Sequence, residues 1–147
     1  MRPTLVVIDM QTTFRASFKP SVVVGVTTEI IKAKEKLLPI VVVEYKNCHP
    51  THKALLDLLK NYPHKARITK SGDDGSSEVI RTLRRRGFNQ DYIRVCGVNT
   101  DACVWATAEG LLKKLRYAQI EVVKSACATE FDFNWRRYFK HRRMILI

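Results

Sequence analysis

Short apolar segments alternate with longer amphipathic ones along most of the chain. Four consecutive apolar residues at 5–8, and again at 40–43, are typical of parallel strands buried on both faces of a sheet. Between them, residues 21–38 have the apolar spacing of a helix, which Pro39 ends. The helically spaced positions are Val22, Val26, Ile30, Ala33 and Leu37.

The same alternation continues to the C-terminus. Further strands are predicted at 67–69, 92–96, 120–123 and 144–147. Further helices are predicted from a cap at Thr51 to a stop at Tyr62–Pro63, from Ser76 or Ser77 to Gly87, from Asp101 to Arg116, and from Phe133 to Arg142. This order predicts an α/β domain with a mostly parallel sheet.

Length and composition support a single domain over residues 1–147. A chain of this size, with 46% apolar residues, buries about two-thirds of the surface that its unfolded state exposes. No segment approaches the roughly 20 apolar residues that span a bilayer, and the N-terminus lacks a secretory signal pattern. We therefore expect a cytoplasmic protein with no membrane partner.

The net charge of +12 raises the question of a nucleic-acid partner. Basic residues form one cluster at 84–86 and a second near the C-terminus, at Arg136, Arg137, Lys140, Arg142 and Arg143. Such charge attracts polyanions non-specifically, but no nucleic-acid-binding motif accompanies it. A basic, solvated surface is the simpler interpretation, and dedicated nucleic-acid recognition is the alternative.

Among four cysteines, Cys103 has the setting of a reactive thiol. All four are expected to be free, and Cys96 and Cys127 are expected to be small core residues. Cys103, in contrast, follows a strand, a glycine turn and residues suited to helix capping. This places its sulfur near the positive end of a helix dipole, which favours the thiolate.

Two further polar residues are expected at the same edge of the sheet as Cys103. Asp9 follows the first strand and Lys70 follows the third, and ligands of open parallel sheets bind at the carboxyl ends of strands. Asp9 could accept the thiol proton, and Lys70 could stabilise the anions. Each residue also has an alternative interpretation without a catalytic role. Asp9 is then a turn cap, Lys70 a solvated lysine that pairs with Asp73 or Asp74, and Cys103 a small buried residue.

Three segments together resemble the isochorismatase-like cysteine hydrolases, a family that includes nicotinamidases and N-carbamoylsarcosine amidases. They are Leu5–Gln11 (LVVIDMQ) with Phe14, Ile68–Lys70 (ITK) and Cys96–Val104 (CGVNTDACV). The resemblance extends from about Leu5 to Ala128, with the motifs in the family's order. It implies a Rossmann-like three-layer α/β/α fold of five strands in the order 3-2-1-4-5, or six if the C-terminal segment pairs.

The resemblance also implies a catalytic set. By matching position, Asp9 is the proton acceptor, Lys70 the supporting cation and Cys103 the nucleophile. A cis peptide bond between Val98 and Asn99 is implied, with an oxyanion hole formed by the backbone N–H groups of Asn99 and Cys103. The implied reaction is hydrolysis of a C–N bond in a small amide or ureide through a thioester, without a cofactor, in a homo-oligomer.

The chain departs from the family between its second and third strands. It is short there, and residues 44–52 lack the Asp-x-His metal motif of nicotinamidases. Cys48, His49 and His52 are the remaining candidate ligands, but a surface loop is the simpler interpretation and we expect no metal. The candidate pocket residues, for which aromatic core packing is the alternative, are Phe14, Trp105 and Phe131.

The expected function is therefore that of a cysteine hydrolase with a small-molecule substrate. One alternative is a catalytically inactive relative that binds nucleic acid or an acidic partner through its basic surface. A thiol redox role is weaker, because the chain has no Cys-x-x-Cys pair.

Overall fold

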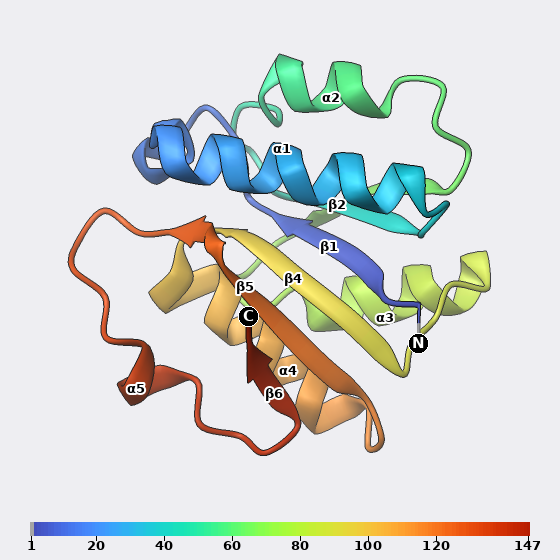
Figure 1. The fold of residues 1–147 in the computed structure, drawn as a ribbon, viewed down its shortest axis with the longest axis vertical. Coiled ribbons are helices and arrows are strands. Elements are labelled where there is room, and N and C mark those ends of the chain that lie inside the picture. The colour runs from blue at the N-terminus through green and yellow to red at the C-terminus, as the bar shows by residue number, and fades with distance from the viewer. Residues whose placement is uncertain (1) are drawn as a thin grey trace.

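The computed structural model describes residues 2–147, in which a six-stranded sheet lies between two layers of helices (Figure 1). All neighbouring strands are parallel, in the order β3-β2-β1-β4-β5-β6. The strands are β1 (Thr4–Ile8), β2 (Ile40–Tyr45), β3 (Lys65–Lys70), β4 (Tyr92–Val98), β5 (Gln119–Ala128) and β6 (Met144–Leu146). The expected fold class and strand order are confirmed, including the sixth strand.

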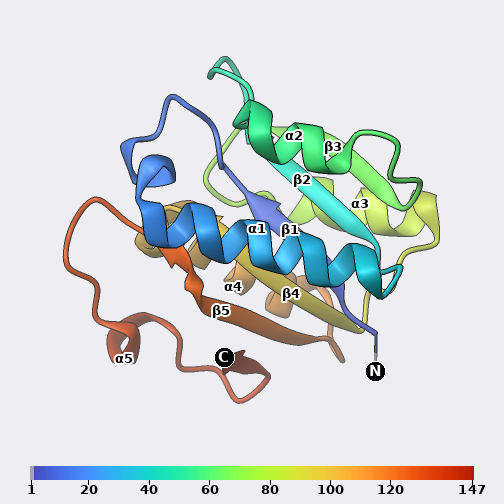
Figure 2. The ribbon, with the colours of Figure 1, turned by 45° about the horizontal axis from the view of Figure 1, so that its top comes forward.

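Helices cover both faces of the sheet (Figure 2). One face carries α1 (Pro20–Glu35) and α2 (Lys53–Leu59), and the other carries α3 (Ser76–Arg86) and α4 (Trp105–Lys114). Side chains of each strand alternate between the two resulting cores, so that Val6 and Ile8 pack toward α3 and α4. This two-sided burial explains why the strand segments are continuously apolar. Among residues 2–147, no helix has both the length and the apolar character needed to cross a membrane.

Helix α1 ends earlier than the sequence predicts, at Glu35 rather than Leu38. Leu37 adopts a left-handed conformation with φ of +53°, which turns the chain out of the helix before Pro39. The apolar spacing nevertheless identifies the correct face, because its first four helical positions are fully buried or nearly so.

The C-terminal helix α5 spans only Trp135–Tyr138 instead of the predicted 133–142. Its side chains form an aromatic cluster, in which the ring centroid of Phe133 lies 4.9 Å from those of both Trp135 and Tyr138. The side chain of Asn134 caps the short helix by accepting a hydrogen bond from the backbone N–H of Arg136. Aromatic packing, rather than helical periodicity, determines the backbone here.

One predicted helix cap is wrong, whereas one predicted terminator is confirmed. The Thr51 hydroxyl donates to the Glu44 carboxylate at 2.8 Å and does not cap α2. Gly87 ends α3 in the left-handed conformation, as predicted.

Strands β1 and β4 approach each other closely at Gly97. The φ angle of Gly97 is +120°, and a Cβ atom placed there would lie 2.0 Å from the carbonyl oxygen of Ile8. Only glycine fits such a conformation and such a close approach. This contact positions the end of β4, from which the chain passes to Asn99 and Cys103.

We predict that Gly97→Ala lowers the free energy of unfolding by more than about 3 kcal/mol, because the backbone of Ile8 cannot retreat without breaking the sheet. Gly72→Ala is the control, since a Cβ atom there meets nothing within 4 Å. Its effect should stay below about 0.5 kcal/mol. Urea denaturation followed by circular dichroism measures both values, and a wild-type stability of Gly97→Ala would contradict the prediction.

Candidate active site

Asp9, Lys70 and Cys103 converge at the carboxyl edge of the sheet. Asp9 directly follows β1, Lys70 is the last residue of β3, and Cys103 lies in the turn η2 (Thr100–Val104) after β4. Strand β2 lies between β1 and β3, so the Lys70 side chain reaches across the end of β2 to Asp9. The structure thus brings together the three residues of the predicted catalytic set.

Asp9 and Lys70 form a buried ion pair. Lys70 Nζ lies 3.1 Å from Asp9 Oδ2, and their side chains are 0% and 1% exposed. The ammonium group also donates hydrogen bonds to the carbonyl oxygens of Gly72 at 2.9 Å and Asp73 at 3.3 Å. The alternative of a solvated lysine is therefore wrong, and each buried charge depends on the other for compensation.

The carboxylate of Asp9 retains unused acceptor capacity. Neither of its oxygens has a hydrogen-bond donor in suitable geometry among residues 2–147, although Lys70 lies within ion-pair distance. Burial raises the pKa of Asp9, and the positive charge of Lys70 opposes this shift. Asp9 is consequently a stronger base than a solvated aspartate.

The thiol of Cys103 is nearly inaccessible, with 5% of the residue exposed. Burial raises its pKa well above the ordinary value, the negative charge of Asp9 adds to this, and Lys70 opposes it. The position near a helix start favours a lowered pKa, but Cys103 lies in a single π-helical turn before α4, and desolvation is the largest contribution to the raised pKa. A raised pKa favours the protonated thiol, so attack requires a base, and Asp9 is close enough for its charge to act on the thiol.

The chain between β4 and α4 has the backbone feature that the resemblance implies. The Val98–Asn99 peptide bond is cis. The carbonyl oxygen of Asn99 accepts hydrogen bonds from the N–H groups of Ala102 and Val104, both at 3.1 Å. The oxyanion hole at the N–H groups of Asn99 and Cys103 stays a prediction.

Two residues outside the predicted catalytic set, Asp73 and Tyr45, contact the Cys103 thiol and the Lys70 ammonium group. Asp73 Oδ1 accepts from the Cys103 thiol at 3.7 Å and from the Tyr45 hydroxyl at 3.4 Å. The Tyr45 ring lies over Lys70, with 4.1 Å between Nζ and the ring centroid. Their positions in the sequence carry a signal, because Tyr45 ends β2 and Asp73 follows β3, at the edge where Asp9 lies.

The side chain of Gln11 links the segment after β1 to the end of β2 by hydrogen bonds. Its buried side-chain amide accepts from the backbone N–H of Tyr45 at 2.6 Å and donates to the carbonyl oxygens of Tyr45 and His49. These hydrogen bonds fix the backbone of Tyr45 and so hold its ring next to Lys70. The glutamine of the LVVIDMQ segment is thus a positioning residue.

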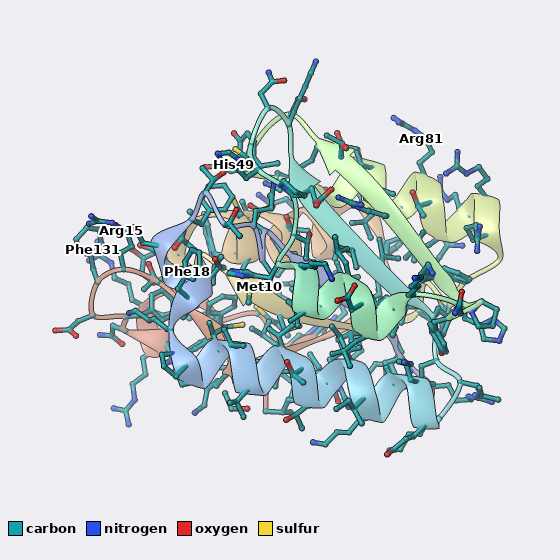
Figure 3. The ribbon with its side chains drawn as sticks, turned by 90° about the horizontal axis from the view of Figure 1, so that it is seen from above. Met10, Arg15, Phe18, His49, Arg81 and Phe131 are labelled. Atoms are coloured by element: carbon teal, nitrogen blue, oxygen red, sulfur yellow. The ribbon has the colours of Figure 1, made fainter. Side chains whose placement is uncertain are left out.

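The three aromatic candidates do not come together as one pocket wall. The Phe14 ring lies 6.4 Å from that of Tyr45, beside the covered site. The indole N–H of Trp105 donates to the carbonyl oxygen of Tyr138 at 3.1 Å, within the C-terminal aromatic cluster. Phe131 is 76% exposed and extends outward from the loop after β5 (Figure 3).

The loop that carries Cys48, His49 and His52 is tied to the segment after β1. His52 Nε2 lies 2.8 Å from the hydroxyl oxygen of Ser17, and the backbone N–H of His49 donates to Thr13 Oγ1 at 2.8 Å. Within residues 2–147, no group of three or more His, Cys, Asp or Glu side chains is arranged to hold a metal ion.

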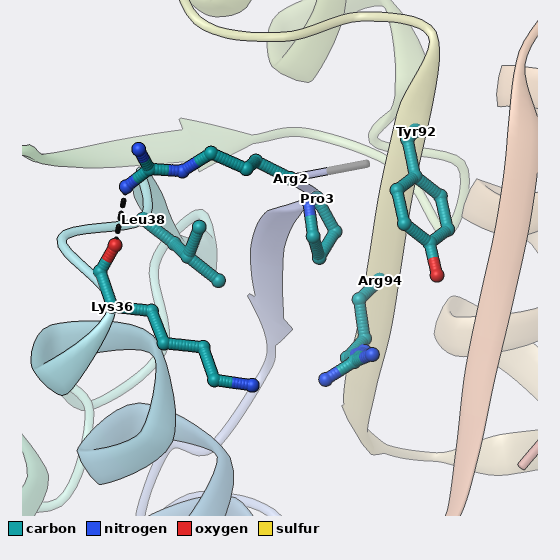
Figure 4. Close-up of a pocket in the computed structure, with 6 residues that line it drawn as sticks. All are labelled: Arg2, Pro3, Lys36, Leu38, Tyr92 and Arg94. Carbon is teal, nitrogen blue, oxygen red and sulfur yellow. Dashed lines mark hydrogen bonds between the residues drawn. The ribbon is translucent and has the colours of Figure 1, made fainter.

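A separate cavity of about 420 Å³ opens at the opposite, amino-terminal edge of the sheet (Figure 4). Its lining consists of Arg2, Pro3, Lys36, Leu38, Tyr92 and Arg94. The guanidinium of Arg94 already forms ion pairs with Glu121 at 2.7 Å and Glu29 at 3.2 Å. This cavity is therefore distinct from the cluster around Cys103.

A family model described as the Isochorismatase domain matches residues 3–143, so the chain belongs to the isochorismatase family. No curated protein gives a match. Solved structures that share the fold include the following three. A pyrazinamidase/nicotinamidase from Streptococcus mutans has 23% identity over 99% of each chain and a TM-score of 0.77. An N-carbamoylsarcosine amidase from Thermoplasma acidophilum has 24% identity over 99% of this chain and 95% of that one, with a TM-score of 0.72. A nicotinamidase from Staphylococcus aureus has 21% identity over 87% and 83%, with a TM-score of 0.72.

We predict that Lys70→Met lowers the free energy of unfolding by about 3–5 kcal/mol at neutral pH, because it leaves the Asp9 carboxylate buried without its cation. In wild type the charge of Lys70 lowers the pKa of Asp9 against the effect of burial, so its removal raises that pKa further in the folded variant. The folded variant then binds the Asp9 proton more tightly than folded wild type does, so its deficit is smallest below the ordinary aspartate pKa of 3.8 and grows as the pH rises.

Urea denaturation of this variant and of wild type between about pH 4 and pH 8 measures that pH dependence. The double variant Asp9→Asn with Lys70→Met is the control, because it removes the buried charge. It should be more stable than Lys70→Met at neutral pH and should lose the added pH dependence. A deficit of Lys70→Met that is constant with pH would contradict the interpretation.

Proposed function

We propose that this protein is a cysteine hydrolase that cleaves the C–N bond of a small amide or ureide. The observation that carries the proposal is the convergence of the Cys103 thiol, the unsatisfied Asp9 carboxylate and the buried Lys70 ammonium at one edge of the sheet. Membership of the isochorismatase family supports it. The structures that share the fold include nicotinamidases and an N-carbamoylsarcosine amidase, whose names denote amide substrates.

In the first step, the sulfur of Cys103 attacks the carbonyl carbon of the substrate and the thiol proton passes to Asp9. Because the raised pKa of Cys103 keeps the proton on sulfur in the resting state, its transfer accompanies C–S bond formation. Burial raises the pKa of Asp9 as well, which makes the carboxylate a better acceptor. Lys70 keeps Asp9 ionised until the attack.

The tetrahedral intermediate then collapses to a thioester on Cys103. The C–N bond breaks, and Asp9 returns the proton to the leaving nitrogen. Water attacks the thioester with Asp9 again as base, which releases the acid and restores the thiol. In this scheme the N–H groups of Asn99 and Cys103 stabilise both oxyanions.

We predict that Cys103→Ala lowers kcat/KM by at least about a thousandfold on any amide or ureide that the wild-type protein hydrolyses, because it removes the nucleophile. Substrates are found by incubating the protein with a panel of small amides and ureides and reading the mass of the acyl adduct on Cys103. The fold of the variant should persist, since alanine fits the space of the buried thiol.

Cys48→Ala is the matched control, because Cys48 is a free, half-buried thiol in the loop after β2. This variant should keep both turnover and the adduct. Undiminished turnover by Cys103→Ala would overturn the mechanism.

A further inference from the structure

Acceptor oxygens dominate the polar groups that meet at the candidate site. Asp9 Oδ1 and Asn99 Oδ1 are buried without a hydrogen-bond partner among residues 2–147, whereas Asp9 Oδ2 faces the Lys70 ammonium at 3.1 Å. Asp73 Oδ1 adds a further acceptor, contacted only at the long distances of 3.7 Å by Cys103 and 3.4 Å by Tyr45. Buried acceptors without donors are costly, so a ligand that supplies N–H donors is favoured here.

The charge of Asp73 is not matched within the site. The Lys70 ammonium is compensated by Asp9 at 3.1 Å, and it contacts Asp73 only through the backbone carbonyl. None of the ion pairs found within residues 2–147 involves Asp73. The neighbouring Asp74, in contrast, pairs with Lys114 at 3.5 Å. One negative charge without an ion-pair partner therefore lies in contact with the thiol.

Asp73 lies next to the sulfur that a substrate must reach. Its exposed side chain contacts the thiol of Cys103, a residue that is 5% exposed, so a carbonyl group at the sulfur lies close to the Asp73 carboxylate. The backbone of this loop is held in place from two sides. Lys70 and the hydroxyl of Thr107 both donate to the carbonyl oxygen of Asp73, at 3.3 Å each.

We propose that Asp73 determines specificity, by selecting amides that carry a cationic nitrogen next to the scissile carbonyl and by excluding those that carry a carboxylate there. The proposal rests on the hydrolase function, since it names the substrate class of the same site. A cationic ammonium or guanidinium group would pair with Asp73 in place of the thiol contact and would supply N–H donors to the neighbouring acceptors. A carboxylate in that position would face Asp73 with a like charge.

Charged thiol reagents test this selection without any need for turnover. Trimethylammonioethyl methanethiosulfonate and sulfonatoethyl methanethiosulfonate differ in charge, and with each the Cys103 sulfur displaces methanesulfinate to form a mixed disulfide while its proton goes to solvent. The rate at Cys103 is read by peptide mass mapping, separately from the rate at Cys48. The variants are Asp73→Asn and, as the matched control with the same change in net charge, Asp74→Asn.

Wild-type Cys103 should react faster with the cationic reagent. Asp73→Asn should lower the ratio of cationic to anionic rates at Cys103 by at least about fivefold, while Asp74→Asn should change it by less than about twofold. The ratio at Cys48 should stay constant in both variants. Equal effects of the two variants, a wild type without preference, or a Cys103 inert to both reagents would overturn the proposal.

Three small amides of different charge then separate this proposal from the hydrolase function. Glycinamide should acylate Cys103 faster than propionamide, and malonamate should be slowest. If the amides acylate Cys103 irrespective of charge, the hydrolase function stands and the role of Asp73 is overturned. If the reagent ratio depends on Asp73 but none of the amides acylates Cys103, charge selection by Asp73 is upheld and the hydrolase function on such amides is contradicted.

Discussion

The ion pair between Asp9 and Lys70 is the interaction on which the rest of the site depends. It joins the ends of β1 and β3, which are not neighbours in the sheet, across the end of β2. The same ammonium group fixes the loop after β3 through the carbonyl oxygens of Gly72 and Asp73. The buried Lys70 ammonium thus compensates the charge of Asp9, the candidate base, and holds the loop after β3 next to the thiol. Since each buried charge is costly without the other, the stability of the fold is coupled to the geometry of the site.

Much of the fold could be predicted from the sequence, because burial on both faces of a parallel sheet leaves continuous apolar strand segments such as Leu5–Ile8. The order of the strands followed from the family resemblance rather than from periodicity. Predictions failed where specific packing of side chains accompanies a change in the backbone. The segment 133–142 has helical spacing, but its aromatic rings pack against one another and shorten α5 to four residues. Periodicity marks which face is apolar, and it carries no information on such tertiary packing.

Part of the candidate site could likewise be predicted from the sequence, and part could not. Asp9, Lys70 and Cys103 could be brought together from the sequence, because each follows or ends a strand and parallel strands share one carboxyl edge. Asp73 could be assigned to the same edge from its position after β3, but its contact with the thiol could not, since that depends on how the loop after β3 folds. The direction of the Cys103 pKa shift also depends on burial that the sequence does not give. Position near a helix start favours a thiolate, whereas the loss of hydration on burial raises the pKa.

The covered, protonated thiol also bears on how the protein withstands oxidants. Peroxides react with thiolates far faster than with thiols, and sulfinic and sulfonic products are not reversed by ordinary reductants. A nucleophile that was permanently ionised and open would be oxidised in the intervals between turnovers. Cys103 is instead 5% exposed, its pKa is raised by burial, and its sulfur contacts Asp73. Burial and the raised pKa both reduce the amount of thiolate that an oxidant can reach.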